Sequence, residues 1–240
     1  MKTGTIVLGI CSSSEGERKV IDRCVDYLVD KNRRNVRPAF YHGAPGAYDV
    51  MKDMFLNEGV DTFCILPICI AEGDLTVWRM PKALTLPDNS GSWTKIGNDD
   101  IATRFATALG FECDVAESIS ELIGEPANDK GALIIAYGSK LSQSEKTAAA
   151  YVSYLRNRGW IAEYGFTRFG RSAKEAAESL IEKGCKDIYV VPLMISVDGK
   201  SFTSTVSDLQ SLDCEVDIME PVAEMDAFYR ILDGKVPEGW

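Results

Sequence analysis

The sequence predicts an α/β protein in which two tandem, similar halves, each built on a parallel β-sheet, face one another across a cleft. Two observations predict this fold. First, short apolar runs typical of buried strands alternate with segments of helical periodicity, the pattern of parallel sheets covered by helices. Second, the same order of elements occurs twice along the chain, at an offset of 125 to 127 residues. We interpret this constant offset as internal duplication.

The predicted elements correspond pair by pair. Each half opens with a buried strand after a glycine, continues with a helix and a second strand, and then has a helix that ends in glycine, the favoured residue just past a helix. A third apolar strand ending near a proline follows. The paired segments are 4–14 and 131–141, 37–40 and 163–166, 49–59 and 174–184, and 59–70 and 184–195. We therefore divide the chain into an N-terminal half (1–123), a linker rich in Gly, Pro and Asn (124–130) and a C-terminal half (131–240).

Several local predictions complete this outline. Ser12 with Glu15, and Ser142 with Glu145, have the spacing of a capping box, which predicts a helix start after the first strand of each half. Residues 84–96 are expected to form an irregular loop. Segments 101–111 and 224–234 are expected to be the terminal helices of the two halves.

Composition limits the classes of function. The formal net charge of −10 disfavours nucleic acid and anionic membranes as main partners. The apolar run Ile6–Cys11 is too short for a signal segment, and no run approaches the ~20 apolar residues of a membrane helix, so we expect a cytoplasmic protein. Seven cysteines without a CxxC pair favour reduced thiols. Duplication makes a monomer sufficient without forbidding a homo-oligomer.

Ligands of parallel α/β sheets bind beyond the carboxyl ends of the strands. In the first half the turns expected at this edge are 10–13, 41–43 and 71–75, and in the second half they are 137–140, 167–171 and 197–200. These turns contain His42, the single histidine of the chain, so a mechanism that needs two histidines is excluded.

Three stretches resemble the class II chelatases, the CbiX-type sirohydrochlorin cobalto- and ferrochelatases of cobalamin and sirohaem synthesis: AYGSK (136–140), VVPLMISVDGK (190–200) and LPICIAEGDLTVWRMP (66–81). The resemblance extends over nearly the whole chain, once per half, as in the duplicated long members. It implies two flavodoxin-like halves, a cleft that holds a planar tetrapyrrole, and insertion of a divalent metal such as Co, Ni or Fe without ATP. The family's His, Glu and His metal-site positions match Tyr137, Arg168 and Lys200 in the second half, and Ile10, His42 and Leu75 in the first.

Because Arg and protonated Lys cannot bind a cation, neither half keeps the family's metal site. His42 and Cys11 are the candidate metal ligands, since imidazole and thiolate suit soft divalent metals, and His42 is the candidate catalytic base. The candidate substrate-binding residues are Ser12, Tyr137, Ser139, Lys140, Arg168, Arg171 and Lys200. The basic members could clamp the carboxylates of a tetrapyrrole.

Each candidate also has an ordinary interpretation: a solvated loop histidine, a buried cysteine, a tyrosine packed at a strand end, or scattered surface charge. Three functions follow from these alternatives. The chain is a divergent chelatase, a non-catalytic protein that binds a tetrapyrrole or another polycarboxylate, or an unrelated two-lobed anion-binding protein.

Overall fold

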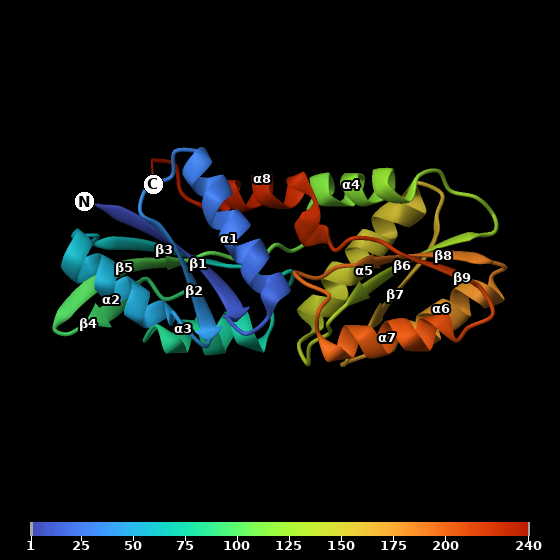
Figure 1. Ribbon diagram of the computed structural model, residues 1–240, viewed down its shortest axis with the longest axis horizontal. Coiled ribbons are helices and arrows are strands. Elements are labelled where there is room, and N and C mark those ends of the chain that lie inside the picture. The colour runs from blue at the N-terminus through green and yellow to red at the C-terminus, as the bar shows by residue number, and fades with distance from the viewer. Residues whose placement is uncertain (1, 240) are drawn as a thin grey trace. The chain divides into compact units, whose positions relative to one another are not determined.

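A computed structural model describes residues 2–239, which form two compact units (Figure 1). Unit 1 contains the chain up to Leu109 together with the segment from Tyr229 onward, and unit 2 contains Gly110–Phe228. Among the helices of the described residues, none is long and apolar enough to span a bilayer. Both units contain a sheet whose parallel strands are connected through helical segments, as the alternating apolar pattern predicted.

Unit 1 has a five-stranded sheet in the order β2-β1-β3-β5-β4. All neighbouring pairs are parallel except β4 and β5. The strands are β1 (Thr3–Cys11), β2 (Val36–His42), β3 (Thr62–Pro67), β4 (Trp93–Ile96) and β5 (Asp99–Phe105). The helical elements are α1 (Glu15–Asp30), α2 (Ala47–Glu58), the π-helical turn η1 (Leu75–Arg79), α3 (Met80–Ala83) and the later part of α8 (Asp226–Lys235).

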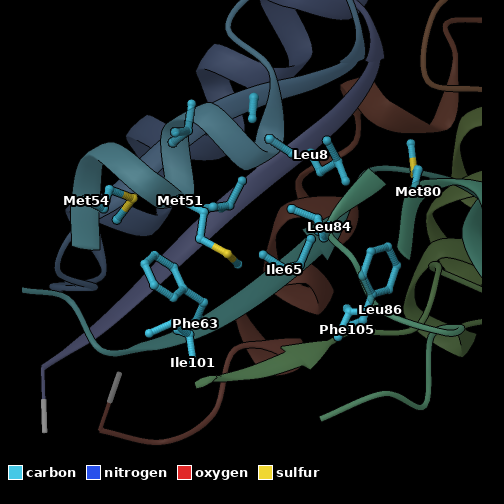
Figure 2. Close-up of a cluster of buried hydrophobic side chains, with 14 of the residues drawn as sticks. Leu8, Met51, Met54, Phe63, Ile65, Met80, Leu84, Leu86, Ile101 and Phe105 are labelled. Atoms are coloured by element: carbon cyan, nitrogen blue, oxygen red, sulfur yellow. The ribbon is translucent and has the colours of Figure 1, made fainter. Parts of the chain in front are cut away.

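The core of unit 1 follows from strand alternation, because successive side chains of a strand point to opposite faces. Residues of β1, β3 and β5 such as Leu8, Phe63 and Phe105 meet Met51 and Met54 of α2, and all five are buried (Figure 2). On the other face, Gly9 lets α1 approach closely, since a Cβ there would lie 2.9 Å from a side-chain carbon of Ile21.

The predicted helix over 101–111 is wrong, and the predicted loop over 84–96 is wrong in its last residues. Residues 93–105 form the antiparallel hairpin of β4 and β5 instead. The connection between these strands is the pair Gly97 and Asn98, a two-residue turn typical of hairpins. Ile101, Thr103 and Phe105 are buried at alternating positions because β5 pairs with β3, so strand alternation prevails over the helical reading.

Unit 2 has a four-stranded parallel sheet in the order β7-β6-β8-β9. Its strands are β6 (Lys130–Ala136), β7 (Ile161–Phe166), β8 (Asp187–Pro192) and β9 (Glu215–Ile218). Its helices are α4 (Cys113–Ile123), α5 (Ser142–Asn157), α6 (Ala173–Glu182), α7 (Lys200–Gln210) and the 3-10 turn η2 (Val222–Glu224). The order β7-β6-β8 repeats the order β2-β1-β3 of unit 1. Internal duplication and the cleft stay predictions.

The compact units do not divide at the predicted boundaries of 123 and 131, because each contains a helix expected in the other half. α4 belongs to unit 2, where Tyr151 donates a hydrogen bond of 3.2 Å to the Gly110 carbonyl and stacks edge-on with Phe111. The later part of α8 belongs to unit 1, where Arg33 Nε lies 2.8 Å from Asp233 Oδ1. Amphipathic periodicity predicts that a helix exists, but not which sheet it covers.

The two predicted capping boxes are also wrong. Ser14, not Ser12, caps α1, and its hydroxyl accepts a 3.1 Å hydrogen bond from the Glu17 amide. In unit 2 the residue before α5 is Leu141, and Ser142 is already the first helical residue. Relative to the Ser-x-x-Glu spacing, α1 therefore begins two residues later, and α5 begins one residue earlier and has no side-chain cap.

Candidate functional site

The carboxyl edge of the unit 2 sheet brings together the turns that follow β6 and β7. The Thr167 amide donates to the Ala136 carbonyl at 3.0 Å, and the Thr167 hydroxyl donates to the Tyr137 carbonyl at 3.3 Å. Gly138 makes this approach possible, because a Cβ there would lie 2.5 Å from the Phe169 carbonyl oxygen. Side chains from the two turns are thus held side by side, as expected from the position of parallel strand ends.

Four side chains of these turns form one exposed group, which we call the cation–aromatic cluster: Tyr137, Lys140, Arg168 and Phe169. Arg168 Nη1 donates a 2.8 Å hydrogen bond to the Tyr137 hydroxyl oxygen. The Arg168 guanidinium carbon lies 5.7 Å from the centre of the Tyr137 ring and 5.8 Å from that of Phe169, and Lys140 Nζ lies 6.0 Å from the latter. The hydrogen bond with Tyr137 raises the pKa of Arg168, so the guanidinium stays charged.

This cluster offers two kinds of contact to a ligand. Tyr137 and Phe169 are 50% and 39% exposed, which leaves aromatic surface available for stacking. The cations beside them can pair with carboxylates, and Arg does so in a bidentate manner. A planar anion with peripheral acid groups matches both features.

The other predicted residues of unit 2 are placed differently. Lys200 is the exposed first residue of α7, on the turn that follows β8. Ser139 Oγ accepts a 3.1 Å hydrogen bond from the Leu141 amide and shapes the turn before α5. The Arg171 guanidinium is already bound by residues of its own unit, because it donates to Glu163 at 2.8 Å and to the Glu175 carbonyl at 3.1 Å.

Arg171 is oriented by its ion pair with Glu163. The Glu163 side chain lies in β7, is 9% exposed and also receives Arg156 and Lys183. Burial alone would raise the pKa of Glu163, but hydrogen bonds from Lys183 and Arg171 outweigh that effect and leave the pKa lowered. Arg171 therefore compensates a buried carboxylate.

At the carboxyl edge of unit 1, Cys11 and His42 end the neighbouring strands β1 and β2 and are partners in the parallel register. Register partners point to the same face of a sheet, so the thiol and the imidazole share one side. The Ser12 amide donates to the His42 carbonyl at 3.0 Å, which ties the two turns together. His42 is exposed, and its ring packs edge-on against Tyr41 with centres 4.4 Å apart.

The surroundings of Cys11 favour the thiolate. Cys11 Sγ lies 3.0 Å from Ser13 Oγ, and hydrogen bonds from the Ser13 side chain and backbone lower the pKa of Cys11. Glu17 opposes this shift through its charge, and its carboxylate accepts a 3.3 Å hydrogen bond from the Cys11 amide. In contrast, burial raises the pKa of Cys24 to about 12 and that of Cys64 to about 11.

The third turn of unit 1 adds residues that the sequence analysis did not single out. Arg79 of η1 lies over Tyr41, with its guanidinium carbon 5.7 Å from the ring centre, and the neighbouring Trp78 is 44% exposed. Glu72 has a structural role, because its carboxylate accepts hydrogen bonds from the Ala108 amide at 2.9 Å and from the Thr76 hydroxyl at 2.7 Å. A signal was present, since Trp78-Arg79 and Arg168-Phe169 both place an aromatic residue beside an arginine.

Within residues 2–239, no group of three or more His, Cys, Asp and Glu side chains has an arrangement that could hold a metal ion. Cys11 and His42 are thus a pair of neighbouring candidate ligands and not part of a larger group of this kind among these residues.

The sequence was compared with protein-family models and with curated proteins. The CbiX family model matches residues 131–228. A sirohydrochlorin cobaltochelatase of Sulfolobus acidocaldarius is 33% identical over 67 residues, which are 28% of this chain and 54% of that relative, so the match spans about half of the relative's length. The matched family segment begins within β6 and covers unit 2 from there to its end, without α4.

Two solved structures have the same fold. SirB from Bacillus subtilis with Fe³⁺ superposes with a TM-score of 0.79 at 13% identity, covering 98% of this chain and 94% of that one. The sirohydrochlorin chelatase SirB of Bacillus subtilis subspecies spizizenii in complex with cobalt gives 0.76 at 11% identity, with 98% and 94% covered. The comparisons therefore support a relationship with the CbiX/sirohydrochlorin chelatase family, and residues 131–228 carry the match to the family model.

Proposed function

We propose that this protein binds a sirohydrochlorin-type tetrapyrrole through the cation–aromatic cluster of unit 2. The observation that carries the proposal is Arg168, hydrogen-bonded to Tyr137 and placed over two exposed aromatic rings. Sirohydrochlorin is a planar ring with many carboxylates, so the rings would stack on its face while Arg168 and Lys140 pair with its acid groups. Lys200 would add a third cation, and the Ser139 hydroxyl can still donate to a carboxylate while its oxygen accepts from Leu141.

We further propose that the tetrapyrrole is metallated by a divalent ion such as cobalt, nickel or iron, with Cys11 and His42 as the candidate donors to the metal. Insertion of a divalent ion releases two pyrrole protons, so the reaction needs a base as well as a metal donor. His42 can serve as either, and the lowered pKa of Cys11 favours its thiolate, the form that binds metals. The Ser12 hydroxyl, in the turn tied to His42, is a candidate donor to a ring acid group.

A second candidate function is binding of the tetrapyrrole without metal insertion. The positions that resemble the family's metal ligands in unit 2 are Tyr137, Arg168 and Lys200, and a guanidinium already hydrogen-bonded to a phenol cannot coordinate a cation. This observation favours a carrier or sensor over an enzyme. Both candidates share the ring-binding site and differ only in the fate of the metal.

Titration with metal-free sirohydrochlorin, followed by absorbance and fluorescence, tests the shared site. We expect Arg168→Ala to weaken binding about tenfold, since a lost charge-assisted hydrogen bond costs about 1.5 kcal/mol or more. Lys186→Ala is the matched control, because Lys186 is an exposed cation next to the amino end of β8, at the opposite edge of the same sheet. Equal affinity of wild type and Arg168→Ala would exclude the cluster as the ring-binding site.

The rate of cobalt insertion into the bound ring, measured against the rate in free solution, separates the two candidates. An enzyme should accelerate insertion, and His42→Ala and Cys11→Ser should each slow it while ring affinity stays unchanged. Ring binding without acceleration would establish the non-catalytic alternative. Acceleration that survives both substitutions would remove the role proposed for the Cys11 and His42 pair.

A further inference from the structure

A cavity of about 760 Å³ lies at the amino edge of the unit 1 sheet. It is lined by residues at the start of β1, by the loop that joins α1 to β2, and by Gly239. Cys11 and His42 stand at the other end of the same two strands, so this cavity is separate from the site described above. Four of the lining residues are cationic: Lys2, Lys31, Arg33 and Arg34.

The side chains of three of these four cations have no carboxylate partner among the described residues, although the Lys2 backbone amide donates to the Asp61 carboxylate at 3.0 Å. Arg33 alone is neutralised, since its guanidinium binds Asp233 at 2.8 Å and the Pro237 carbonyl at 3.0 Å. Lys2 Nζ donates to the neutral Glu58 carbonyl at 2.6 Å, and Lys31 Nζ lies 5.4 Å from the Tyr27 ring centre. Arg34 is exposed, and no hydrogen bond or ion pair of its side chain occurs within residues 2–239.

The loop that carries these charges has a fixed shape. Asn32 and Asn35 adopt the left-handed backbone conformation, with φ angles of 63° and 51°, which asparagine tolerates better than most residues. The Asn35 amide group donates to the Thr3 carbonyl at 2.7 Å and ties the loop to β1. Arg33 ties the same loop to the segment around Asp233. The cations therefore lie on a loop that is already fixed at both contacts, so binding of an anion would need little further ordering of this loop.

We propose that this cavity is a second anion site, which binds a small molecule with two or more phosphate or carboxylate groups. A protein of net charge −10 repels anions overall, so a local group of uncompensated cations is needed to attract one. Arg34 supplies a bidentate donor fork, Lys2 and Lys31 supply point charges, and Asn32 supplies a neutral amide in the wall. The volume is in the usual range for small-molecule sites, about 300–1,000 Å³.

Isothermal titration at low ionic strength tests the site, because salt screens exposed charges. Tripolyphosphate and citrate are the two probes, and they separate phosphate from carboxylate ligands. We expect at least one to bind wild-type protein, and the double variant Lys31→Ala/Arg34→Ala to bind it at least tenfold more weakly. The matched control is Lys52→Ala/Lys82→Ala, which removes two exposed cations from α2 and α3 of the same unit.

Three results would overturn the site: failure of both probes to bind, equal weakening by the control pair, or loss of probe binding in Arg168→Ala instead. Thermal unfolding without ligand shows whether Lys31→Ala/Arg34→Ala still folds, and Arg34→Gln gives a milder variant if it does not. Sirohydrochlorin titration of the double variant keeps this proposal distinct from the proposed function. Ring affinity should be unchanged there, whereas Arg168→Ala should lose ring affinity and keep probe binding.

Discussion

Arg168 donates a 2.8 Å hydrogen bond to the hydroxyl oxygen of Tyr137, and this contact joins the turns after β7 and β6. An exposed arginine is usually mobile, and holding a long side chain in one geometry costs conformational entropy. Here the phenol and the neighbouring Phe169 ring keep the guanidinium at the carboxyl edge before any ligand arrives. Affinity for an anionic ring should therefore depend on Tyr137 even if Tyr137 never touches an acid group.

Tyr137→Phe tests this dependence because it removes the hydroxyl oxygen and leaves the ring. We expect the dissociation constant for sirohydrochlorin to rise about fivefold, the equivalent of one hydrogen bond of about 1 kcal/mol. Tyr154→Phe is a close control, since Arg158 donates to Tyr154 at 2.7 Å on the surface of the same unit. If both substitutions leave the affinity unchanged, the tyrosine does not organise the site.

The reactivity of Cys11 should depend on Ser13. Hydrogen bonds from Ser13 lower the pKa of Cys11, so the thiolate persists to lower pH than for an ordinary thiol with a pKa near ~8.5. Iodoacetamide rates followed by peptide mass spectrometry between pH 6 and 9 should give a low apparent pKa for Cys11, and Ser13→Ala should raise it. Cys24 and Cys64 should stay unmodified in the folded protein, since both are buried with raised pKa values. Equal profiles of wild type and Ser13→Ala would contradict this account.

Gly138 should be intolerant of substitution for two separable reasons. Its φ of +89° disfavours any side chain, and an added Cβ would meet the Phe169 carbonyl at 2.5 Å. Gly184 has a similar φ of +93°, but there nothing lies within 4 Å of the added carbon. Urea unfolding should therefore show a loss of about 1–2 kcal/mol for Gly184→Ala, from the backbone alone, and a clearly larger loss for Gly138→Ala. Equal losses would mean that the turn relaxes without cost.

The first three strands of each half were predictable because apolar runs such as 4–11 and 131–136 have few alternatives to a buried strand, whereas β9 was not predicted. The hairpin of β4 and β5 was not recognised, although Gly97 and Asn98 carry a turn signal, because residues 101–111 read equally as an apolar helix. The exchange of terminal helices was beyond sequence reasoning. The apolar stripe of α4, with Val115 and Ile119, could cover either sheet, and only packing decides.

The candidate site also has some features that were predictable from the sequence and others that were not. The rule that ligands meet strand ends placed Tyr137, Lys140 and Arg168 at one edge, and the structure adds that Phe169 completes the group. The same rule put Cys11 and His42 at one edge, and the two residues are partners in the strand register. Arg171 lies in the predicted turn, but its guanidinium pairs with Glu163 instead of being available to a ligand. Its partner Glu163 lies four residues before the predicted turn 167–171, and nothing in the local sequence shows that this carboxylate is buried.

Glu163 makes stability depend on pH in a definite direction. Its pKa is lowered in the folded protein, so its stabilising contribution is present above the unfolded pKa of about 4.3 and is lost as the pH falls through the folded value. Glu163→Gln should therefore reduce the free energy of unfolding by about 1–3 kcal/mol at pH 7, less than a fully buried pair because the three cations are about half exposed. The gap between wild type and variant should narrow steadily below pH 4.5. Glu178→Gln, an exposed carboxylate on α6, is the control and should shift stability little at either pH. A gap that stays constant down to pH 3 would mean that Glu163 contributes through packing rather than through its charge.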